Sequence, residues 1–203
     1  MYNENKISIR DMAYIAMFAA VMAVMSQLSL PLPGGVPVTL QTFGAALTGY
    51  MLGAKRGAWA VIVYVLLGAA GVPVFAGFHG GLGSVLGQLG GFIWGFIPMA
   101  FLCGLGADIA GRRGFCKPLG EGSENASRRH ILCNAAPAVA LGLLGLAVCH
   151  LCGVVQWTSV KGGGFFGSFL VVSAPFLLKD AVSTAAAYFV SAAVVKRVGT
   201  VKA

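Results

Sequence analysis

The chain has 203 residues, of which 58% are hydrophobic and only 10% are charged. Soluble domains carry about 25% charged residues, so a soluble fold of this size would lack the polar side chains to cover its surface. Together with a mean hydropathy of +0.85, this excludes a soluble enzyme, a disordered chain and a secreted disulfide-stabilised domain, and it indicates an integral membrane protein.

Six apolar stretches follow one another along the chain. A helix needs about 20 apolar residues to span a bilayer, so the chain has room for one membrane domain, over residues 1–203, and none for a nucleotide-binding domain. The sequence therefore predicts an all-α integral membrane fold of six transmembrane helices. Their predicted bounds are Asp11–Leu30, Val38–Gly53, Ala58–Ala70, Ser84–Ala107, Ile131–Val155 and Phe166–Val195.

The connections between these stretches are rich in proline, glycine or charge. The segment Gly71–Gly83 combines several glycines with a proline, which predicts an irregular or re-entrant loop. Pro175, inside the last stretch, predicts a kink because proline removes a helix hydrogen bond. The other predicted connections are Leu30–Pro37, the charged turn Ala54–Gly57, and the segments Asp108–His130 and Gln156–Gly164.

The net charge of +8 is compatible with nucleic-acid binding, but its distribution favours a role in membrane topology. With six spans, the two termini share one side with the second and fourth connections. All of the Lys and Arg residues fall on that side except Lys161 and Lys179. This positive-inside bias predicts that both termini are cytoplasmic.

Asp180 is the acidic residue that lies deep in a predicted span, with Lys179 beside it. An ionisable residue in hydrocarbon costs about 2.5–3.5 kcal/mol on insertion scales, so it persists where it is paired, faces a cavity or is functional. We expect Asp180 to face a polar ligand pocket; a structural ion pair is the alternative. Adjacent helical residues point about 100° apart, so both side chains would face one ligand only if Pro175 bends the helix.

Two further segments offer ligand contacts. Thr39 and Gln41 place hydrogen-bonding groups at the outer end of the second span, although Thr39 is also suited to cap a helix. The glycine-rich loop after the third span lets backbone approach a ligand closely, and Phe75 and Phe78 suit an apolar ligand body. Such a loop can act as a lid, and the alternative is a flexible external loop.

Small residues recur every four positions on several spans, which lets membrane helices pack closely. We expect these residues to pack helices of the chain against one another. On the first span they could instead form a face for an external partner. The residues are Ala16, Ala19, Ala20 and Ala23 on the first span, Gly49 and Gly53 on the second, and Gly87, Gly91 and Gly95 on the fourth.

Several chemistries are missing from the sequence. It has no phosphate-binding G-x-x-x-x-G-K-[ST] loop and no H-E-x-x-H zinc motif. Cys149 and Cys152 have metal-ligand spacing but no second pair, and no Ser/His/Asp constellation can be assembled around Asp108 or Asp180. An intramembrane enzyme would need a second ionisable group facing Asp180, for which Lys179 is the available candidate. We therefore expect no metal, no cofactor and no enzymatic activity.

Four motifs, in this order along the chain, resemble the BioY family, whose members are substrate-binding subunits of energy-coupling-factor biotin transporters. The motifs are Pro37-Val-Thr-Leu-Gln-Thr-Phe43, Tyr64-x-x-x-Gly-x-x-Gly-x-Pro-Val-Phe75, Gly87-x-x-Gly-Gly-Phe-x-x-Gly-Phe96 and Pro175-Phe-x-x-Lys-Asp180. The chain departs from the family where Gln88, Leu89 and Phe92 stand for the usual Pro, Thr and Tyr. It departs again at Ser183, where many members carry a lysine.

The resemblance implies a six-helix subunit in a bacterial plasma membrane that captures biotin from outside. It also implies partners, namely a transmembrane coupling protein and two ABC-type ATPases, with Ala16 and Ala20 similar to the family's docking face. A subunit or facilitator for a different small vitamin is the alternative. The substrate-binding residues predicted in this way are Asp180, Lys179, Gln41, Thr39, Tyr64, Phe75, Gly90 and Trp94.

Biotin's chemistry suits these residues. Its ureido ring has two N–H donors for the Asp180 carboxylate and one carbonyl for Gln41 or Lys179. Its apolar thioether ring suits Tyr64, Phe75 and Trp94, and its valerate carboxylate would reach backbone N–H groups of the glycine loop.

Overall fold

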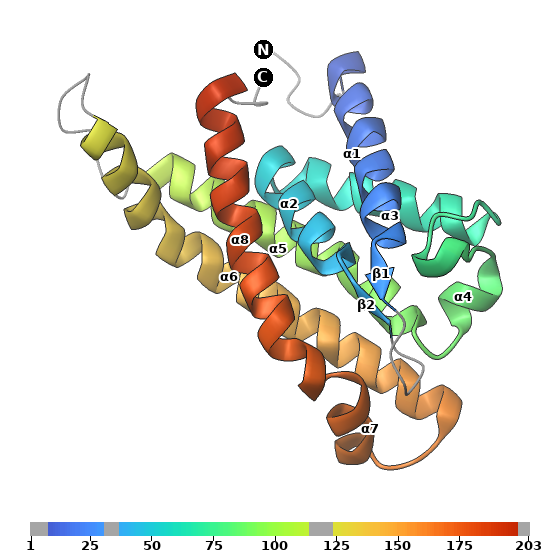
Figure 1. The fold of residues 1–203 in the computed structure, drawn as a ribbon. Coiled ribbons are helices and arrows are strands. Elements are labelled where there is room, and N and C mark those ends of the chain that lie inside the picture. Colours follow the sequence, from blue (N-terminus) through green and yellow to red (C-terminus); the bar gives the residue numbers. More distant parts are fainter. Residues whose placement is uncertain (1–7, 31–36, 114–123, 199–203) are drawn as a thin grey trace.

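The computed structural model describes residues 8–30, 37–113 and 124–198. Within these ranges the chain is mostly helical, with connecting loops and one short antiparallel hairpin, in which Ser29 pairs with Thr39 and Leu30 with Val38 (Figure 1). The elements in order are α1 (Ile9–Gln27), β1 (Ser29–Leu30), β2 (Val38–Thr39), α2 (Gln41–Leu52), α3 (Ala54–Ala69), the 3₁₀ helix η1 (Ala76–Phe78), α4 (Leu82–Leu86), α5 (Gly90–Arg113), α6 (Glu124–Lys161), α7 (Phe165–Val172) and α8 (Ala174–Val198).

Four helices of the described part are long and apolar enough to cross a membrane: α1, α5 over 90–110, α6 over 135–161, and α8 over 174–195. The helices α2 and α3 have 12 and 16 residues. At about 1.5 Å per residue both fall short of the roughly 30 Å of a hydrocarbon core. The all-helical prediction is confirmed, and the count of six spans stays a prediction.

Several predicted boundaries were wrong. The tetrad 54–57 is the first turn of α3 rather than a connection, because Gly53, with φ of 81°, makes the turn on its own. α6 begins inside the segment predicted as the loop 108–130, and it continues to Lys161 through the segment predicted as the next loop. The predicted fourth span is also interrupted, because α4 ends before α5 begins at Gly90.

The predicted last span is two helices, α7 and α8, that meet at Ser173. The backbone N–H of Ser173 donates to Phe169 as the last bond of α7, while its carbonyl accepts from Phe176 and Leu177 in the first turn of α8. Pro175 therefore does not kink a helix interior. It sits in the first turn of α8, where its missing N–H has no helical partner to lose.

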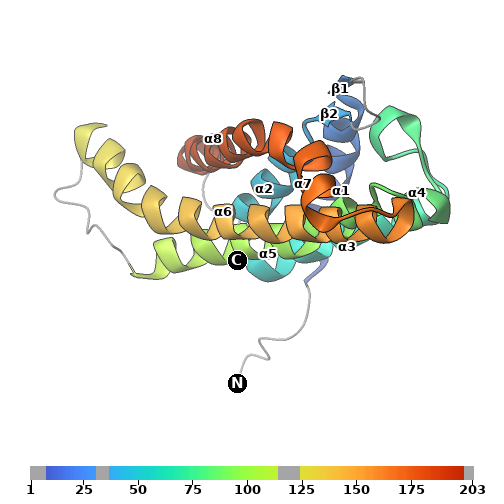
Figure 2. The same cartoon turned by 90° about the horizontal axis from the view of Figure 1, so that it is seen from below.

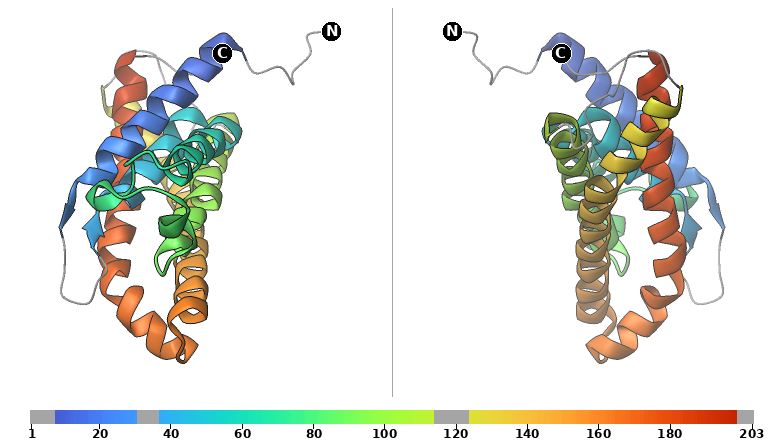
Figure 3. Two further views of the ribbon diagram at one scale, coloured as in Figure 1. Left: turned by 90° about the vertical axis from the view of Figure 1, so that its right-hand side faces the viewer. Right: turned by 90° about the vertical axis from the view of Figure 1, so that its left-hand side faces the viewer.

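The helices α5 and α6 lie side by side and antiparallel, and α7 connects the far end of α6 to α8 (Figures 2 and 3). The close approach of α5 to α6 needs glycine. A Cβ added at Gly91 would lie 2.2 Å from the carbonyl oxygen of Cys152, and one at Gly95 would lie 2.7 Å from the Cα of Cys149. The predicted small-residue packing of this helix is confirmed at both positions.

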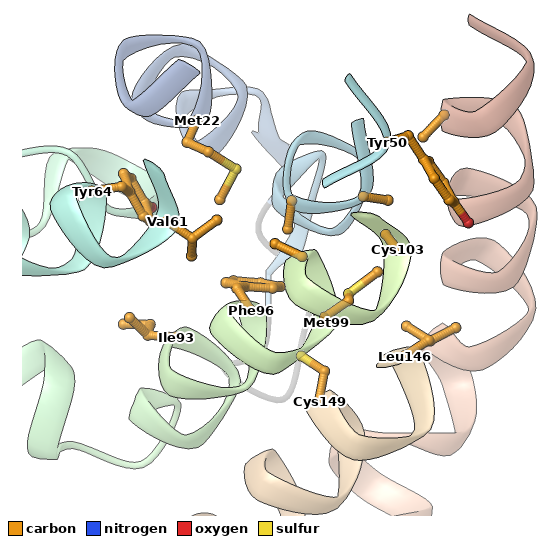
Figure 4. Packing of buried hydrophobic residues seen from close by; sticks show 14 of the residues in the cluster. Met22, Tyr50, Val61, Tyr64, Ile93, Phe96, Met99, Cys103, Leu146 and Cys149 are labelled. Atoms are coloured by element: carbon orange, nitrogen blue, oxygen red, sulfur yellow. The ribbon is translucent and has the colours of Figure 1, made fainter. Parts of the chain in front are cut away.

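The largest hydrophobic core lies between α1, α2, α3, α5 and α6 (Figure 4). Met22, Tyr64 and Met99 have essentially no exposed surface there, and Phe96 points from α5 toward α3. Gly49 of α2 approaches α5 closely, since an added Cβ would lie 2.3 Å from the carbonyl oxygen of Ala100. This core fixes α2 and α5, which form two walls of the site described below.

Polar contacts tie together one end of the bundle, where α1 starts, α2 meets α3 and α5 ends. Arg56 pairs with Asp11 at 3.0 Å, and Asp108 accepts from the backbone N–H of Ala54 at 3.1 Å. The last turns of α8 lie at the same end (Figure 3). The hairpin, η1, α4 and α7 lie away from it (Figure 1).

Candidate functional site

A cavity of about 690 Å³ lies between β2, α2, the loop around η1, the α4–α5 junction, α6 and the start of α8. Its volume is in the range of small-molecule sites, about 300–1,000 Å³. Aromatic rings form much of its wall, and polar side chains gather at one side. The aromatic residues are Phe75, Phe92, Phe96 and Phe176, and the polar residues of that side are Thr39, Gln41, Thr42, His150, Lys179 and Asp180.

Asp180 and Lys179 both line this cavity, as the sequence predicts, but without the bend predicted at Pro175. Asp180 is 5% exposed. The long side chain of Lys179 turns toward its neighbour, so that Nζ lies 2.5 Å from Asp180 Oδ1, and it donates to the carbonyl of Thr39 at 2.8 Å. The ion pair and the pocket, which were alternatives for Asp180 on sequence grounds, therefore exist together.

His150, on α6, is the functional candidate that the sequence reasoning missed. Its Nε2 lies 3.4 Å from Asp180 Oδ2, and its Nδ1 lies 2.7 Å from the hydroxyl of Ser173. The expectations that Lys179 alone would face Asp180, and that no Ser/His/Asp group would form, were both wrong. The sequence held one usable signal, since a histidine inside an apolar span also needs a partner.

This trio does not present a nucleophile to the cavity. Ser173 has no exposed surface and does not line the cavity, whereas His150 and Asp180 do. A serine that attacks a substrate must reach the substrate's reacting atom. The hydroxyl of Ser173 is therefore placed to orient the imidazole ring, not to react.

Gln41 and Thr39 are brought to the cavity by the junction of β2 with α2. The Thr39 hydroxyl accepts from the backbone N–H of Gln41 at 3.4 Å and donates to its side-chain oxygen at 3.2 Å. Thr39 thus supports the start of α2 and lines the cavity as well. The side-chain nitrogen of Gln41 donates to the hydroxyl of Tyr64 at 2.8 Å.

Phe75 lines the cavity, whereas Tyr64, Gly90 and Trp94 do not. Tyr64 lies behind the wall, where it bonds Gln41 and meets Phe75 edge to face with ring centroids 5.5 Å apart. Gly90 makes the tight entry to α5, since an added Cβ would lie 1.8 Å from the carbonyl oxygen of Val85. Trp94 is 45% exposed, because it points well away from the helix face that carries Phe92 and Phe96.

The loop between α3 and α4 is held in place by the end of α1. Ser26 donates to the carbonyl of Val74, and the Gln27 amide donates to the carbonyl of Phe75 at 3.1 Å. The Gln27 oxygen accepts from the N–H of Phe78 at 3.0 Å, and Phe78 is a non-glycine residue with positive φ (58°). These bonds fix the position of the loop that was predicted to act as a lid, and they are contacts that sequence reasoning missed.

Gln156, predicted to lie in a loop, is on α6 and holds the α4–α5 junction. Its side-chain amide donates to the carbonyls of Val85 at 3.0 Å and Gly87 at 2.7 Å. These carbonyls lie where α4 ends, and that of Gly87 also accepts from the backbone N–H of Gly90 at 3.1 Å. Among the residues that the structure describes, no three His, Cys, Asp or Glu side chains gather as a metal site would require.

Sequence and structure comparisons agree with one another. The chain is 32% identical over 190 residues to the biotin transporter BioY of Rhizobium etli, a match that covers 92% of this chain and 94% of the relative. It is 48% identical over 99 residues to the biotin transporter BioY of Thermotoga maritima, covering 49% of this chain and 58% of the relative.

The fold resembles the crystal structure of the S-component for biotin from an ECF-type ABC transporter. The TM-score is 0.74 at 22% identity, with 100% of this chain and 97% of the other covered. The sequence model of the BioY family matches residues 2–200. The chain therefore belongs to the BioY family, a family of transporter subunits and not of enzymes.

Proposed function

We propose that this chain is the substrate-binding subunit of a biotin uptake transporter and that it binds biotin in the cavity at Asp180. The observation that supports this most is a buried carboxylate that lines a cavity of ligand size. A ureido group has two N–H donors and one carbonyl, and a carboxylate accepts such donors. The aromatic wall suits biotin's apolar fused rings.

In this proposal the residues that line the cavity share the contacts with biotin. Asp180 accepts from the ureido N–H groups. The ammonium of Lys179 has three N–H donors, of which Asp180 and the Thr39 carbonyl engage two, so one remains for the ureido carbonyl. Phe75 and Phe92 cover the thioether ring. The valerate carboxylate extends toward backbone near Gly83 and Gly87, which also line the cavity.

The proposed topology has six spans, with both termini on the cytoplasmic side of a bacterial plasma membrane. The start of α1 and the end of α8 lie at the same end of the molecule (Figure 3). The α2–α3 junction, with Lys55 and Arg56, belongs to that end as well, because Arg56 pairs with Asp11. The positive-inside rule places this end in the cytoplasm. The cavity then opens toward the outside, from which biotin arrives.

The proposed partners are a transmembrane coupling protein and two ABC-type ATPases. Ala16 and Ala20 are exposed on α1, on a face that no helix of the described chain covers. Small residues let a partner helix approach the backbone closely in lipid. We place the coupling protein on this face. The loop closes over biotin, and the whole subunit then reorients against its partner when ATP is hydrolysed.

Calorimetry of the purified subunit with biotin, riboflavin and thiamine, all without ATP, tests the proposed substrate. Biotin is expected to bind with one site and a Kd of about 1 μM or tighter, because the cavity encloses polar and apolar parts together. The other two vitamins should give no saturable signal. Binding of riboflavin or thiamine in place of biotin would instead assign the subunit to a different vitamin.

If the loop between α3 and α4 retains the ligand, loss of its contacts with α1 should speed the release of biotin. The double variant Ser26→Ala with Gln27→Leu removes the side-chain bonds that hold the backbone of Val74, Phe75 and Phe78. Release of radiolabelled biotin into excess unlabelled biotin is expected to be about 100-fold faster, since three bonds of about 1 kcal/mol each are lost. The matched control is Ser159→Ala, whose hydroxyl bonds only its own helix. An unchanged release rate would show that the loop does not retain the ligand.

A further inference from the structure

The chemistry of Ser173, His150 and Asp180 determines which of their atoms donate and which accept hydrogen bonds. An ionised carboxylate only accepts hydrogen bonds, so the Nε2 that faces Asp180 Oδ2 at 3.4 Å must carry a hydrogen. In a neutral imidazole the other nitrogen is then an acceptor. Nδ1 accordingly accepts from the Ser173 hydroxyl at 2.7 Å. One tautomer of His150 satisfies both neighbours.

Each carboxylate oxygen of Asp180 has a basic neighbour, and the side chain of Thr42 also hydrogen-bonds this carboxylate. Lys179 approaches Oδ1 and is itself fixed by the carbonyl of Thr39, whereas His150 approaches Oδ2 and is fixed by Ser173. The lysine ammonium is a point charge, so it does not by itself fix the plane of the carboxylate. The second contact, from His150 on α6 to Oδ2, fixes that plane.

The position of the ring is itself determined by the fold. The break between α7 and α8 places Ser173 behind the ring, and Phe92 meets the ring edge to face with centroids 5.6 Å apart. His150 is 5% exposed, so it cannot rotate freely within its site. A side chain locked by packing and by a second hydrogen bond is able to orient another functional group.

We infer that His150, oriented by Ser173, is a positioning residue that keeps the Asp180 carboxylate turned into the cavity before the ligand arrives. The expected effect on biotin affinity rests on the proposed function. The expected tautomer of His150 rests on the geometry alone. A pre-oriented acceptor spares the ligand the free-energy cost of reorganising the site, so affinity should depend on His150 although Asp180 makes the direct contact.

The first test needs no ligand. Magnetic resonance of the full chain with isotopically labelled histidine reports which ring nitrogen carries hydrogen, and His150→Gln assigns the His150 signals. We expect protonated Nε2 and unprotonated Nδ1 for His150, with a shift of the Nδ1 signal in Ser173→Ala. The opposite tautomer, or no change in Ser173→Ala, would overturn the inference whatever the chain binds.

The second test measures biotin affinity. His150→Leu is expected to bind at least about 10-fold more weakly, because the carboxylate is no longer held in the orientation that the ligand needs. His150→Gln, whose amide can place an N–H near the position of Nε2, should restore affinity to within about 3-fold. Ser173→Ala should weaken binding by a smaller factor, and Ser159→Ala serves as the control.

The outcomes separate the two proposals. Absence of biotin binding by the unmodified protein contradicts the proposed function and leaves the tautomer test to decide on His150. Biotin binding that is unchanged in His150→Leu, or equally weak in His150→Leu and His150→Gln with unaltered melting temperatures, contradicts the positioning role. Should His150→Leu fail to fold, the comparison of Ser173→Ala with Ser159→Ala decides in its place.

Discussion

Replacement of Asp180 by alanine is expected to weaken biotin binding by at least about 100-fold. A hydrogen bond to a charged group contributes roughly 1.5–3 kcal/mol, which is about 10- to 150-fold in affinity, and the ureido ring presents two donors. The same change leaves Lys179 and His150 without the carboxylate that each approaches at 2.5 and 3.4 Å. Calorimetry on the two purified proteins measures the difference.

Two further variants sharpen this prediction. Asp180→Asn retains the shape and one acceptor oxygen but loses the charge, so its affinity should lie between those of the alanine variant and the unmodified protein. Ser191→Ala is the matched control on the same helix, because its hydroxyl bonds only the carbonyl of Tyr188 and it does not line the cavity. Equal affinities for the unmodified protein and Asp180→Ala would remove Asp180 from the site.

Replacement of Gly95 by valine is expected to lower the melting temperature by about 5–10 °C. The added Cβ would lie 2.7 Å from the Cα of Cys149 and 3.0 Å from its carbonyl oxygen, so backbone must move. Overpacking of a dense interior costs about 1–3 kcal/mol or more, and each kcal/mol shifts the melting temperature by about 2–4 °C in a chain of this size. Thermal unfolding in detergent, followed by tryptophan fluorescence, gives the value.

Biotin binding should weaken in the same variant, by about 10-fold, because His150 follows Cys149 directly and moves with α6. The matched control is Gly167→Val on α7, where an added Cβ meets nothing within 4 Å. A melting temperature that falls equally in both variants would contradict the claim that the close packing of α5 against α6 requires glycine at position 95.

Hydropathy predicted the membrane helices of this chain well and their ends poorly. Long apolar runs identify α1, α5, α6 and α8 because each must present apolar surface over its whole length. The run from 166 to 195 is apolar on both sides of Ser173, so composition could not reveal the break there. The continuation of α6 to Lys161 was missed because polar residues such as Gln156 look like a loop until their partners are known.

Cavity residues could be predicted where one residue breaks the local sequence pattern, as a charged residue in an apolar span does. They were missed where the interaction joins residues that are far apart in the sequence. A carboxylate in an apolar span is conspicuous, and Asp180 does line the cavity. His150 and Ser173 are 23 residues apart in sequence, and no local period relates them. Trp94 was predicted to contact the ligand because it suits biotin's apolar thioether ring, but helix geometry turns it away from the face that Phe92 and Phe96 share.

The pairing of Lys179 with Asp180 has a consequence for the electrical work of the transport cycle. Moving one uncompensated elementary charge through a membrane potential costs about 2.3 kcal/mol per 100 mV. Adjacent residues of one helix travel together, so the ammonium and the carboxylate cancel in every orientation of the subunit. If the subunit reorients as proposed, this pair adds no net charge to the movement of the emptied cavity, and no counter-ion is needed to neutralise it.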